Sequence, residues 1–413
     1  MTSVASETLR RYRAHLGKGR AALAELLGGE AEVASSGAWV HTDTGRKLLN
    51  CGGYGVLIMG SRHPRVVEEV TVQLATHPVS TRLFLEPSMG RAAEVLTSVV
   101  PDGLTKVHFA NSGTEAVEAA VKMARSKGKR KLISAHGGYH GKTLGALSLT
   151  AKDTFQRPFQ PLLPDVSHVA YGDADAVRAE LSASPGECCV VLEPVQGEAG
   201  VVIPPSGYLK EISALCQEFG AFFVLDEIQT GMGRLGSWWG ADAESITPDV
   251  LLTGKALGGG LLPVSAAVAT EDAYSEFDRD PFLHTSTFSG SPLGMAAVIG
   301  AIAAVQEDGL VERARHLGAE LLPELRNVVT RVLGDHVRDV RGEGLLIGLE
   351  FATPDVPTLL MVDLVAEGVV ANHSLNEGHV LRFTPPAVLT GSDVAFLLDA
   401  VERAATKVAR WCD

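Results

Sequence analysis

Short apolar runs alternate with stretches of helical pattern through the middle of the chain. Each run is short and nearly all apolar, as strands buried on both faces are. The runs are residues 107–110, 131–135, 189–192, 222–225, 250–253 and 264–269. Residues 114–125 and 209–219, which lie between some of these runs, have the pattern of helices. Strands that alternate with helices predict a parallel sheet covered by helices.

The two ends of the chain have a different pattern from its middle. Near the C-terminus we expect helices over residues 310–333 and 392–411 and strands over 344–351 and 379–384. These elements predict a smaller α/β unit, and a helix over about residues 6–27 is expected to pack with it. Because 413 residues are too many for one ordinary core, we expect two domains. The expected division is 1–48 as an N-terminal segment packing with the small domain, 49–305 as the large domain and 306–413 as the small domain.

Composition and charge argue against several kinds of partner. A net charge of −13 leaves no broad basic surface for nucleic acid or an anionic membrane. The longest stretch of small apolar residues, 295–305, is too short to span a bilayer and predicts a buried helix. Five cysteines without a C-x-x-C spacing indicate neither a disulfide framework nor a zinc site. With no signal peptide evident, we expect a cytoplasmic protein without a metal and without nucleic-acid or membrane partners.

Polar residues follow the predicted strands at the points where the strands end. They are Ser112-Gly113-Thr114, Tyr139-His140-Gly141, Glu193, Asp226 and Lys255. Ligands of open α/β sheets bind outside the carboxyl ends of the strands. One polar residue at a strand end is common, but five sets along one rim indicate a binding site.

Lys255 and Asp226 carry the most specific chemistry at this rim. A lysine is ordinarily a surface residue, but burial at a strand end lowers its pKa and makes it a competent nucleophile for Schiff-base chemistry. Asp226 ends a buried strand and therefore needs a cationic partner. That partner is either a nearby arginine or lysine, or the pyridinium nitrogen of pyridoxal phosphate (PLP), which an acid keeps protonated.

The segment from Asn111 to Thr114 opens a predicted helix and is a candidate phosphate site. Free amides and the helix dipole at such an end bind phosphate. A simple N-cap by Ser112 or Asn111 is the alternative. A cap alone would not need Gly113, which lets a ligand approach the backbone closely.

Two other patterns in the chain are set aside. Residues 138–143 end like a nucleotide-binding P-loop, but that motif needs a glycine where His136 stands. His136 and His140 have the spacing of a metal-binding pair on a helix. The glycines between them disfavour a helix, and no acidic partner motif accompanies them.

Jointly, the motifs resemble those of class III aminotransferases, the fold type I PLP enzymes that include ornithine, acetylornithine and 4-aminobutyrate aminotransferases. The resemblance covers nearly all of the chain, in the family's order. The matching motifs are Gly60, His63-Pro64, Asn-Ser-Gly-Thr-Glu-Ala (111–116), Tyr-His-Gly-Lys-Thr (139–143), Glu-Pro-Val-Gln-Gly-Glu (193–198), Leu-Asp-Glu-Ile-Gln-Thr-Gly (225–231), Thr-Gly-Lys (253–255), Ser-Thr-Phe (286–288), Gly-Ser-Pro-Leu-Gly (290–294) and Arg-Phe-Thr-Pro-Pro (382–386). The family's fold implies a large domain with a mainly parallel, seven-stranded-type sheet, a smaller α/β domain, PLP as cofactor and a homodimer with shared active sites.

The resemblance also implies roles for individual residues toward the cofactor. Lys255 and Asp226 would be catalytic, and the cofactor-binding set would be Ser112, Gly113, Thr114, Tyr139, His140, Glu193, Asp226, Ile228, Gln229, Lys255 and Thr287. Gly113 and Thr114 would contact the phosphate through backbone and hydroxyl groups, and Thr287 would reach the phosphate of the neighbouring subunit. Tyr139 would stack on one face of the ring and Ile228 would press on the other. The amide of Gln229, steadied by Glu193, would reach the ring hydroxyl oxygen.

The implied substrate residues are Tyr54, Lys142, Glu198 and Arg382. Tyr54 would line the pocket. Glu198 and Arg382 would form the pair that the family uses as a substrate gate, with a fixed structural salt bridge as the alternative. Lys142 departs from the family, because many members have an arginine there that clamps a carboxylate with two parallel hydrogen bonds. This departure favours terminal amines, diamines or ω-amino acids as donors over α-amino acids.

The expected reaction moves an amino group from a small amine to PLP and then to an oxo acid such as 2-oxoglutarate or pyruvate. Lys255 would act as general base, and the kinetics would be ping-pong. A racemase, decarboxylating transaminase or aminomutase of the same family is the alternative. The aminomutase branch alters the Gln-Gly-Glu motif, whereas Gln196-Gly197-Glu198 is intact here. A non-catalytic relative is a further alternative, against which the intact Asp226 and Lys255 argue.

Overall fold

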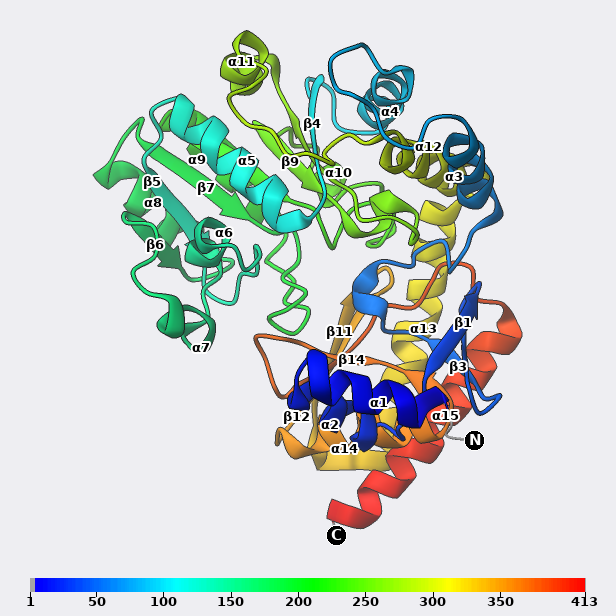
Figure 1. Ribbon diagram of the computed structural model, residues 1–413. Coiled ribbons are helices and arrows are strands. Elements are labelled where there is room, and N and C mark those ends of the chain that lie inside the picture. The colour runs from blue at the N-terminus through cyan, green and yellow to red at the C-terminus, as the bar shows by residue number, and fades with distance from the viewer. Residues whose placement is uncertain (1–3, 413) are drawn as a thin grey trace.

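A seven-stranded sheet forms the centre of the upper part of the molecule (Figure 1) in the computed structural model, which describes residues 4–412. In spatial order its strands are β4 (Lys106–Ala110), β10 (Ser265–Ala269), β9 (Val250–Thr253), β8 (Phe222–Asp226), β7 (Cys188–Leu192), β5 (Lys131–Ala135) and β6 (Val166–Val169). The six strands predicted in this region are confirmed to within one residue at each end. β6 was missed, because Ser167 and His168 interrupt its apolar pattern at the edge of the sheet.

The sheet is parallel except at β10, which is antiparallel to both β4 and β9. The mainly parallel, seven-stranded sheet that the resemblance implied is therefore confirmed, with β10 as its antiparallel strand. A parallel neighbour needs a crossover connection, usually a helix. The chain between Thr253 and Ser265 holds only the short 3-10 helix η3 (Lys255–Gly258) and returns antiparallel.

Alternate residues of the strands face two separate cores, as the strand period of two requires. On β7, Cys189 and Val191 pack in the cluster that includes α5, whereas Val190 and Leu192 pack in the larger cluster. The helices of this part are α5 (Gly113–Ser126), α6 (Leu144–Leu149), α7 (Asp153–Gln156), α8 (Ala174–Ala183), α9 (Tyr208–Glu218), α10 (Gly240–Glu244) and α11 (Glu271–Arg279). Residues buried on both faces explain why these strands lack a polar–apolar alternation.

The predicted buried helix at residues 295–305 lies within α12 (Pro292–Glu307), which packs against α3 (Pro64–Thr76) and α4 (Pro87–Thr97). Among residues 4–412, no single helix is long and apolar enough to cross a membrane. α12 meets the length and composition of a span only together with α13 (Leu310–Leu333), and the two are bent by 60°.

The lower part of the molecule combines both ends of the chain (Figure 1). One sheet has the order β11 (Val337–Glu343), β12 (Leu346–Phe351), β15 (Val380–Phe383) and β14 (Asn372–His373). α13 and α14 (Asp355–Ala366) pack on it, and α15 (Gly391–Cys412) packs against both of these helices. A second sheet has the order β1 (Glu32–Ser36), β2 (Trp39–Thr42), β3 (Lys47–Asn50) and β13 (Val369–Val370). β3 and β13 pair in parallel, so the N-terminal segment shares a sheet with the C-terminal third. The exact domain boundaries remain a prediction.

The N-terminal helix differs from its prediction. Residues 6–27 were expected to form one helix, but the structure has α1 (Val4–His15) and α2 (Lys18–Leu26). Gly17 separates them with φ at 121°, a conformation that ends a helix and that glycine adopts without strain.

Candidate active site

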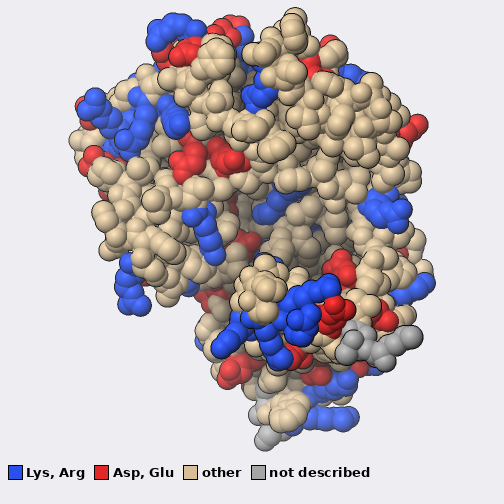
Figure 2. Space-filling model, in the orientation of Figure 1, with Lys and Arg blue, Asp and Glu red and all other residues tan. Residues whose placement is uncertain are grey.

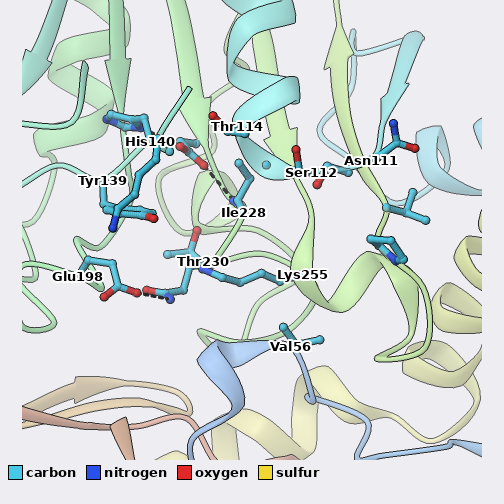
Figure 3. Close-up of a pocket in the computed structure, with 18 of the residues that line it drawn as sticks. Val56, Asn111, Ser112, Thr114, Tyr139, His140, Glu198, Ile228, Thr230 and Lys255 are labelled. Atoms are coloured by element: carbon cyan, nitrogen blue, oxygen red, sulfur yellow. Dashed lines mark hydrogen bonds and ion pairs between the residues drawn. The ribbon is translucent and has the colours of Figure 1, made fainter. Parts of the chain in front are cut away.

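A cavity of about 580 Å³ opens at the carboxyl ends of the central strands. Figure 2 shows a hollow between the upper and lower parts of the molecule, and Figure 3 shows the side chains that line the cavity. All five polar sets predicted at the strand ends line it, and Val56, on the segment after residue 50, lines it from below in Figure 3. The sequence prediction that these residues converge is therefore confirmed.

Lys255 lies in the cavity directly after β9. The residue is half-buried, and the loss of water around its amine lowers the pKa of that amine to about 8. The nearby carboxylates, Glu198 first among them, oppose that shift but do not cancel it. The residue has φ at 46°, an uncommon backbone conformation for a side chain of this size. A cavity lysine with a lowered pKa is a candidate nucleophile and base.

Asp226 ends β8 and is buried. Its Oδ2 lies 2.7 Å from Nδ1 of His140, and its Oδ1 accepts a hydrogen bond from the Ile228 amide. Burial by itself lowers the pKa of His140, but the hydrogen bond and the charge of Asp226 outweigh it, and the net shift is upward. The cationic partner required by Asp226 is thus an imidazole, and neither an arginine nor a lysine forms an ion pair with it in the described chain.

The N-terminus of α5 forms a cradle for an anion. Ser112 is its N-cap, and the carboxylate of Glu115 accepts hydrogen bonds from the Asn111 amide and the Ser112 hydroxyl. The amides of Gly113 and Thr114 donate to no group within residues 4–412. A Cβ on Gly113 would lie 2.9 Å from Cδ1 of Ile228, so only glycine leaves this approach open. Free amides at a helix N-terminus suit a phosphate.

Glu193 and Tyr139 form the wall beside Asp226. Glu193 is buried, which raises its pKa to about 8, and its Oε2 accepts a hydrogen bond from the Tyr139 amide at 3.1 Å. The expected contact from Glu193 to Gln229 is not among the hydrogen bonds of the described residues. Gln229 is held instead by Glu198, because its Nε2 lies 3.3 Å from Glu198 Oε1.

Glu198 and Arg382 form a buried ion pair at 2.8 Å beside this wall. Burial raises the pKa of Glu198, but the charges of Arg382 and Lys255 together with the hydrogen bonds from Leu375 and Arg382 outweigh it, and the net shift is downward. Gln229 bridges the two side chains, and the Leu375 amide donates to the other oxygen of Glu198 at 2.9 Å. The Nε and Nη2 atoms of Arg382 are buried without a hydrogen-bonding partner. An orphaned guanidinium edge is costly unless a ligand satisfies it.

The remaining predicted site residues lie farther from the centre. Lys142 lines the cavity, but its ammonium sits 4.0 Å from the centroid of the Phe155 ring. Tyr54 is 56% exposed. Thr287 is exposed, and its carbonyl accepts a hydrogen bond from Arg82. Thr287 does not line this chain's own cavity.

Sequence reasoning missed the segment Ser374-Leu375-Asn376, which lies in the lower part of the molecule and forms hydrogen bonds with residues of the site. Leu375 bonds to Glu198 through its backbone, and the Asn376 side-chain amide donates to the carbonyls of Gly137 and Gly138 beside Tyr139. The segment contains no recognisable motif. Any residue except proline can donate through its backbone amide, so the contact of Leu375 could not be predicted from the residue type.

Arg234 is a second residue that sequence reasoning missed. Its buried guanidinium donates to the carbonyls of Gly55, Leu345 and Pro385. Burial lowers the pKa of this guanidinium to about 9. Arg234 thus connects the segment after β8 to the segment around Gly55 and to the C-terminal third of the chain.

The site therefore has the parts that PLP requires. Asp226 is a buried acid at a strand end, and Lys255, whose pKa is lowered, lines the same cavity. The amides of Gly113 and Thr114 are free at the N-terminus of α5. No group of three or more His, Cys, Asp or Glu side chains within residues 4–412 is arranged to hold a metal ion.

Comparison with known proteins gives one family. Residues 31–405 match the class-III aminotransferases. The ornithine aminotransferase of Toxoplasma gondii, which holds PLP at partial occupancy in its active site, is 28% identical, with a TM-score of 0.86 and coverage of 98% of both chains. The acetylornithine aminotransferase of Elizabethkingia anophelis is 30% identical, with a TM-score of 0.80, over 94% of this chain and 98% of that one. A transaminase from the marine bacterium Virgibacillus is 26% identical, with a TM-score of 0.88, over 98% and 96%.

Proposed function

The chain belongs to the class III aminotransferases, which are PLP-dependent enzymes, and we propose that it transfers a terminal amino group. The donor would be a small amine, diamine or ω-amino acid. The acceptor would be an oxo acid such as 2-oxoglutarate or pyruvate. The transfer would run in two half-reactions, so that the first product leaves before the oxo acid binds. The fold type I architecture predicted from the resemblance is shown by the same comparisons.

When bound, PLP supplies the electron sink for the carbanion and carries the amino group between the half-reactions. The residues of the chain position it and move the proton. Asp226, supported by His140, would keep the ring nitrogen protonated. The neutral amine of Lys255 would take the proton from the donor carbon that bears the amino group, since its lowered pKa leaves a larger share of it unprotonated near neutral pH than an ordinary lysine would have.

The buried Glu198–Arg382 pair is the observation that carries the proposal. One pocket must accept an amine without an α-carboxylate and then an acid. Arg382 paired with Glu198 presents no net charge to the amine, whereas an arriving carboxylate can replace Glu198 as its partner. Separation does not strand Glu198, because the Leu375 amide and Gln229 still donate to it. The two unpartnered nitrogens of Arg382 already await an acceptor.

Lys142 supports a donor whose carboxylate is not clamped. Its ammonium lies over the Phe155 ring, where a cation–π contact occupies one side of the charge. A lysine also offers a point charge and no planar fork for a bidentate carboxylate. Terminal amines therefore suit the pocket better than α-amino acids.

Arg382→Ala, examined in separate half-reactions, tests the gate. The donor half-reaction should keep most of its rate, and the 2-oxoglutarate half should fall by at least about a hundredfold, since a buried charge pair to the acid is lost. Single-turnover absorbance of the cofactor follows each half separately. Lys142→Ala is the matched control, because it removes a cavity cation without touching the gate. Equal loss in both halves of Arg382→Ala would leave the pair a fixed structural salt bridge.

We also propose that the active unit is a cytoplasmic homodimer. Leu83, Phe84 and Leu85 are 85%, 81% and 102% exposed, an apolar run on the loop before α4. Phe288, beside Thr287, is exposed as well. An apolar surface of this kind suits a second copy of the chain. Buried free thiols at Cys51, Cys188, Cys189 and Cys216 fit a reducing compartment.

A further inference from the structure

The helix that cradles the phosphate is joined to the loop that carries Tyr139 by a chain of three side chains. Glu118 stands one turn after Thr114 on the same face of α5. Its Oε1 lies 2.5 Å from Oγ1 of Thr143, and that oxygen lies 2.7 Å from Oγ1 of Thr114. The Thr143 amide also donates to Thr114 Oγ1 at 3.2 Å.

The carboxylate of Glu118 fixes the direction of the two hydrogen bonds that join the side chains of Glu118, Thr143 and Thr114. An ionised carboxylate accepts and cannot donate, so the Thr143 hydroxyl must donate to Glu118. A hydroxyl has one proton, so at the next contact Thr143 accepts and Thr114 donates. The one proton of the Thr114 hydroxyl is thereby directed at Thr143, away from the free amides of the phosphate cradle.

The packing shows that this junction is built into both elements. Thr143 is the N-cap residue of α6 but makes no side-chain cap of its own, and Glu118 accepts from the Ala146 amide in its place. A Cβ on Gly141 would lie 2.4 Å from Thr114 Oγ1, and one on Gly145 would lie 2.4 Å from Glu118 Oε2. Two glycines therefore leave room for the two α5 side chains.

We infer that Glu118, Thr143 and the Thr114 hydroxyl are positioning residues that set Tyr139 over the cofactor ring, and that the Thr114 hydroxyl does not hold the phosphate. The phosphate is held on this helix by the backbone amides of Gly113 and Thr114. The Ser112 hydroxyl is likewise committed, since it donates to Glu115. This inference replaces the hydroxyl contact that the family resemblance implied for Thr114. It rests on the family's cofactor and is independent of the donor and the gate proposed above.

The test compares Thr114→Val and Thr143→Val in the purified holoenzyme and its cofactor-stripped form. Affinities for PLP and for pyridoxal, which lacks the phosphate, give a ratio that isolates the contribution of the phosphate. Circular dichroism of the bound cofactor in the visible range reports its position against Tyr139. Both valine variants should keep the affinity ratio within about threefold of the starting protein and should change the cofactor dichroism in the same sense. Thr406→Val, on an exposed face of α15 where the hydroxyl bonds only to its own helix, is the control that changes neither.

Conservative variants separate positioning from folding. Glu118→Gln keeps an acceptor oxygen and should restore the dichroism that Glu118→Ala alters, and Thr143→Ser should do the same for Thr143→Val. If a valine variant does not fold, the Glu118 pair carries the comparison alone. A hydroxyl that donated to the phosphate dianion would contribute at least about tenfold to affinity. A fall in the affinity ratio beyond threefold in Thr114→Val, or unchanged dichroism in Thr143→Val and Glu118→Ala, overturns the inference. Failure of the proposed donor or gate would leave these readouts untouched.

Discussion

The carboxylate of Asp226 owes its chemistry to its surroundings. It ends a strand whose five residues are all buried, so water cannot satisfy it. One oxygen contacts the His140 imidazole and the other accepts the Ile228 amide. These contacts fix the plane of the carboxylate. A positioned carboxylate is what a protonated ring nitrogen requires as its partner.

Asp226→Asn should therefore keep the fold and lose at least about a hundredfold in turnover, because the neutral amide no longer favours a protonated ring nitrogen. Steady-state rates with a saturating amine donor measure the loss, and thermal unfolding checks the fold. Asp249→Asn is the matched control. Asp249 is a half-buried acid that accepts the Phe223 amide at the opposite end of the same strands, and its replacement should leave turnover unchanged. Near-normal turnover in Asp226→Asn would reject the assigned role.

The lowered pKa of Lys255 predicts how cofactor attachment depends on pH. Below about pH 8 the amine is mostly protonated and cannot attack, and above it the amine is mostly neutral. In cofactor-stripped protein the rate of covalent PLP attachment should rise about tenfold per pH unit at low pH and level off near pH 8.

Stopped-flow absorbance measures that rate, and borohydride followed by peptide mass analysis should locate the fixed cofactor on Lys255. Lys255→Arg should bind PLP without any borohydride-fixed product. A rate that continues to rise up to the ordinary lysine range near pH 10.5 would contradict the effect of burial.

At the scale of elements, burial decided what could be predicted from sequence. Strands such as β5 and β9 were located because most of their residues are apolar and nearly all are buried, and the polar groups that follow them converge because parallel strands end at one rim. β10 was located, but its antiparallel direction was not assigned, because direction depends on the length of a connection and not on the composition of the strand. The break at Gly17 was missed because one glycine within a helical pattern is often tolerated.

The contacts of the candidate site were harder to predict than its members. Motifs located Gln229 and Glu193, yet the partner of Gln229 is Glu198. Which of two nearby carboxylates an amide meets depends on side-chain geometry within a few ångströms. Likewise, the hydrogen bond between Glu118 and Thr143 could not be predicted from the sequence, because a glutamate on a helix is usually a solvated surface residue.

A prediction at the element scale concerns α13, which crosses from the upper to the lower part of the molecule (Figure 1). A Cβ on Gly318 would lie 2.1 Å from the carbonyl oxygen of Gly344, a contact with backbone that cannot swing away. Alanine gains about 1 kcal/mol in helix propensity over glycine, but overpacking costs about 1–3 kcal/mol, so Gly318→Ala should lower stability. Thermal unfolding measures the difference.

Gly19→Ala in α2 is the control for helix propensity. An added methyl group there meets no atom within 4 Å, so the substitution should leave the unfolding temperature unchanged or slightly raised. A stabilised Gly318→Ala variant would show that α13 can shift away from Gly344 at little cost.

At the scale of the whole molecule, the surface predicts an association. Figure 2 shows few charged side chains over the upper right, where Figure 1 places α3, α4 and α12. The loop before α4 exposes the apolar run from Leu83 to Leu85, and Arg82 on that loop donates to the carbonyls of Ser286, Thr287 and Ser289. Arg82 therefore joins the loop that carries the apolar run to the loop that carries Thr287. If a second copy covers this surface, Thr287 is carried to the partner's site along with it.

Mixing Lys255→Ala subunits with Thr287→Ala subunits tests whether the sites are shared. Each mutant alone should be defective. A mixed dimer has one site with both defects, and its other site receives an intact Lys255 from one subunit and an intact Thr287 from its partner. Activity should therefore recover toward half that of the unmutated dimer in the mixed species, which two different affinity tags isolate. If Thr287 served its own subunit, the Thr287→Ala subunit would keep its defect and the Lys255→Ala subunit would stay inactive, so mixing would recover nothing.

Thr406→Val subunits mixed with Lys255→Ala subunits provide the reference for one good site per dimer. Light scattering confirms that every mixture is dimeric. A monomeric protein with full activity would remove the basis for the shared site altogether.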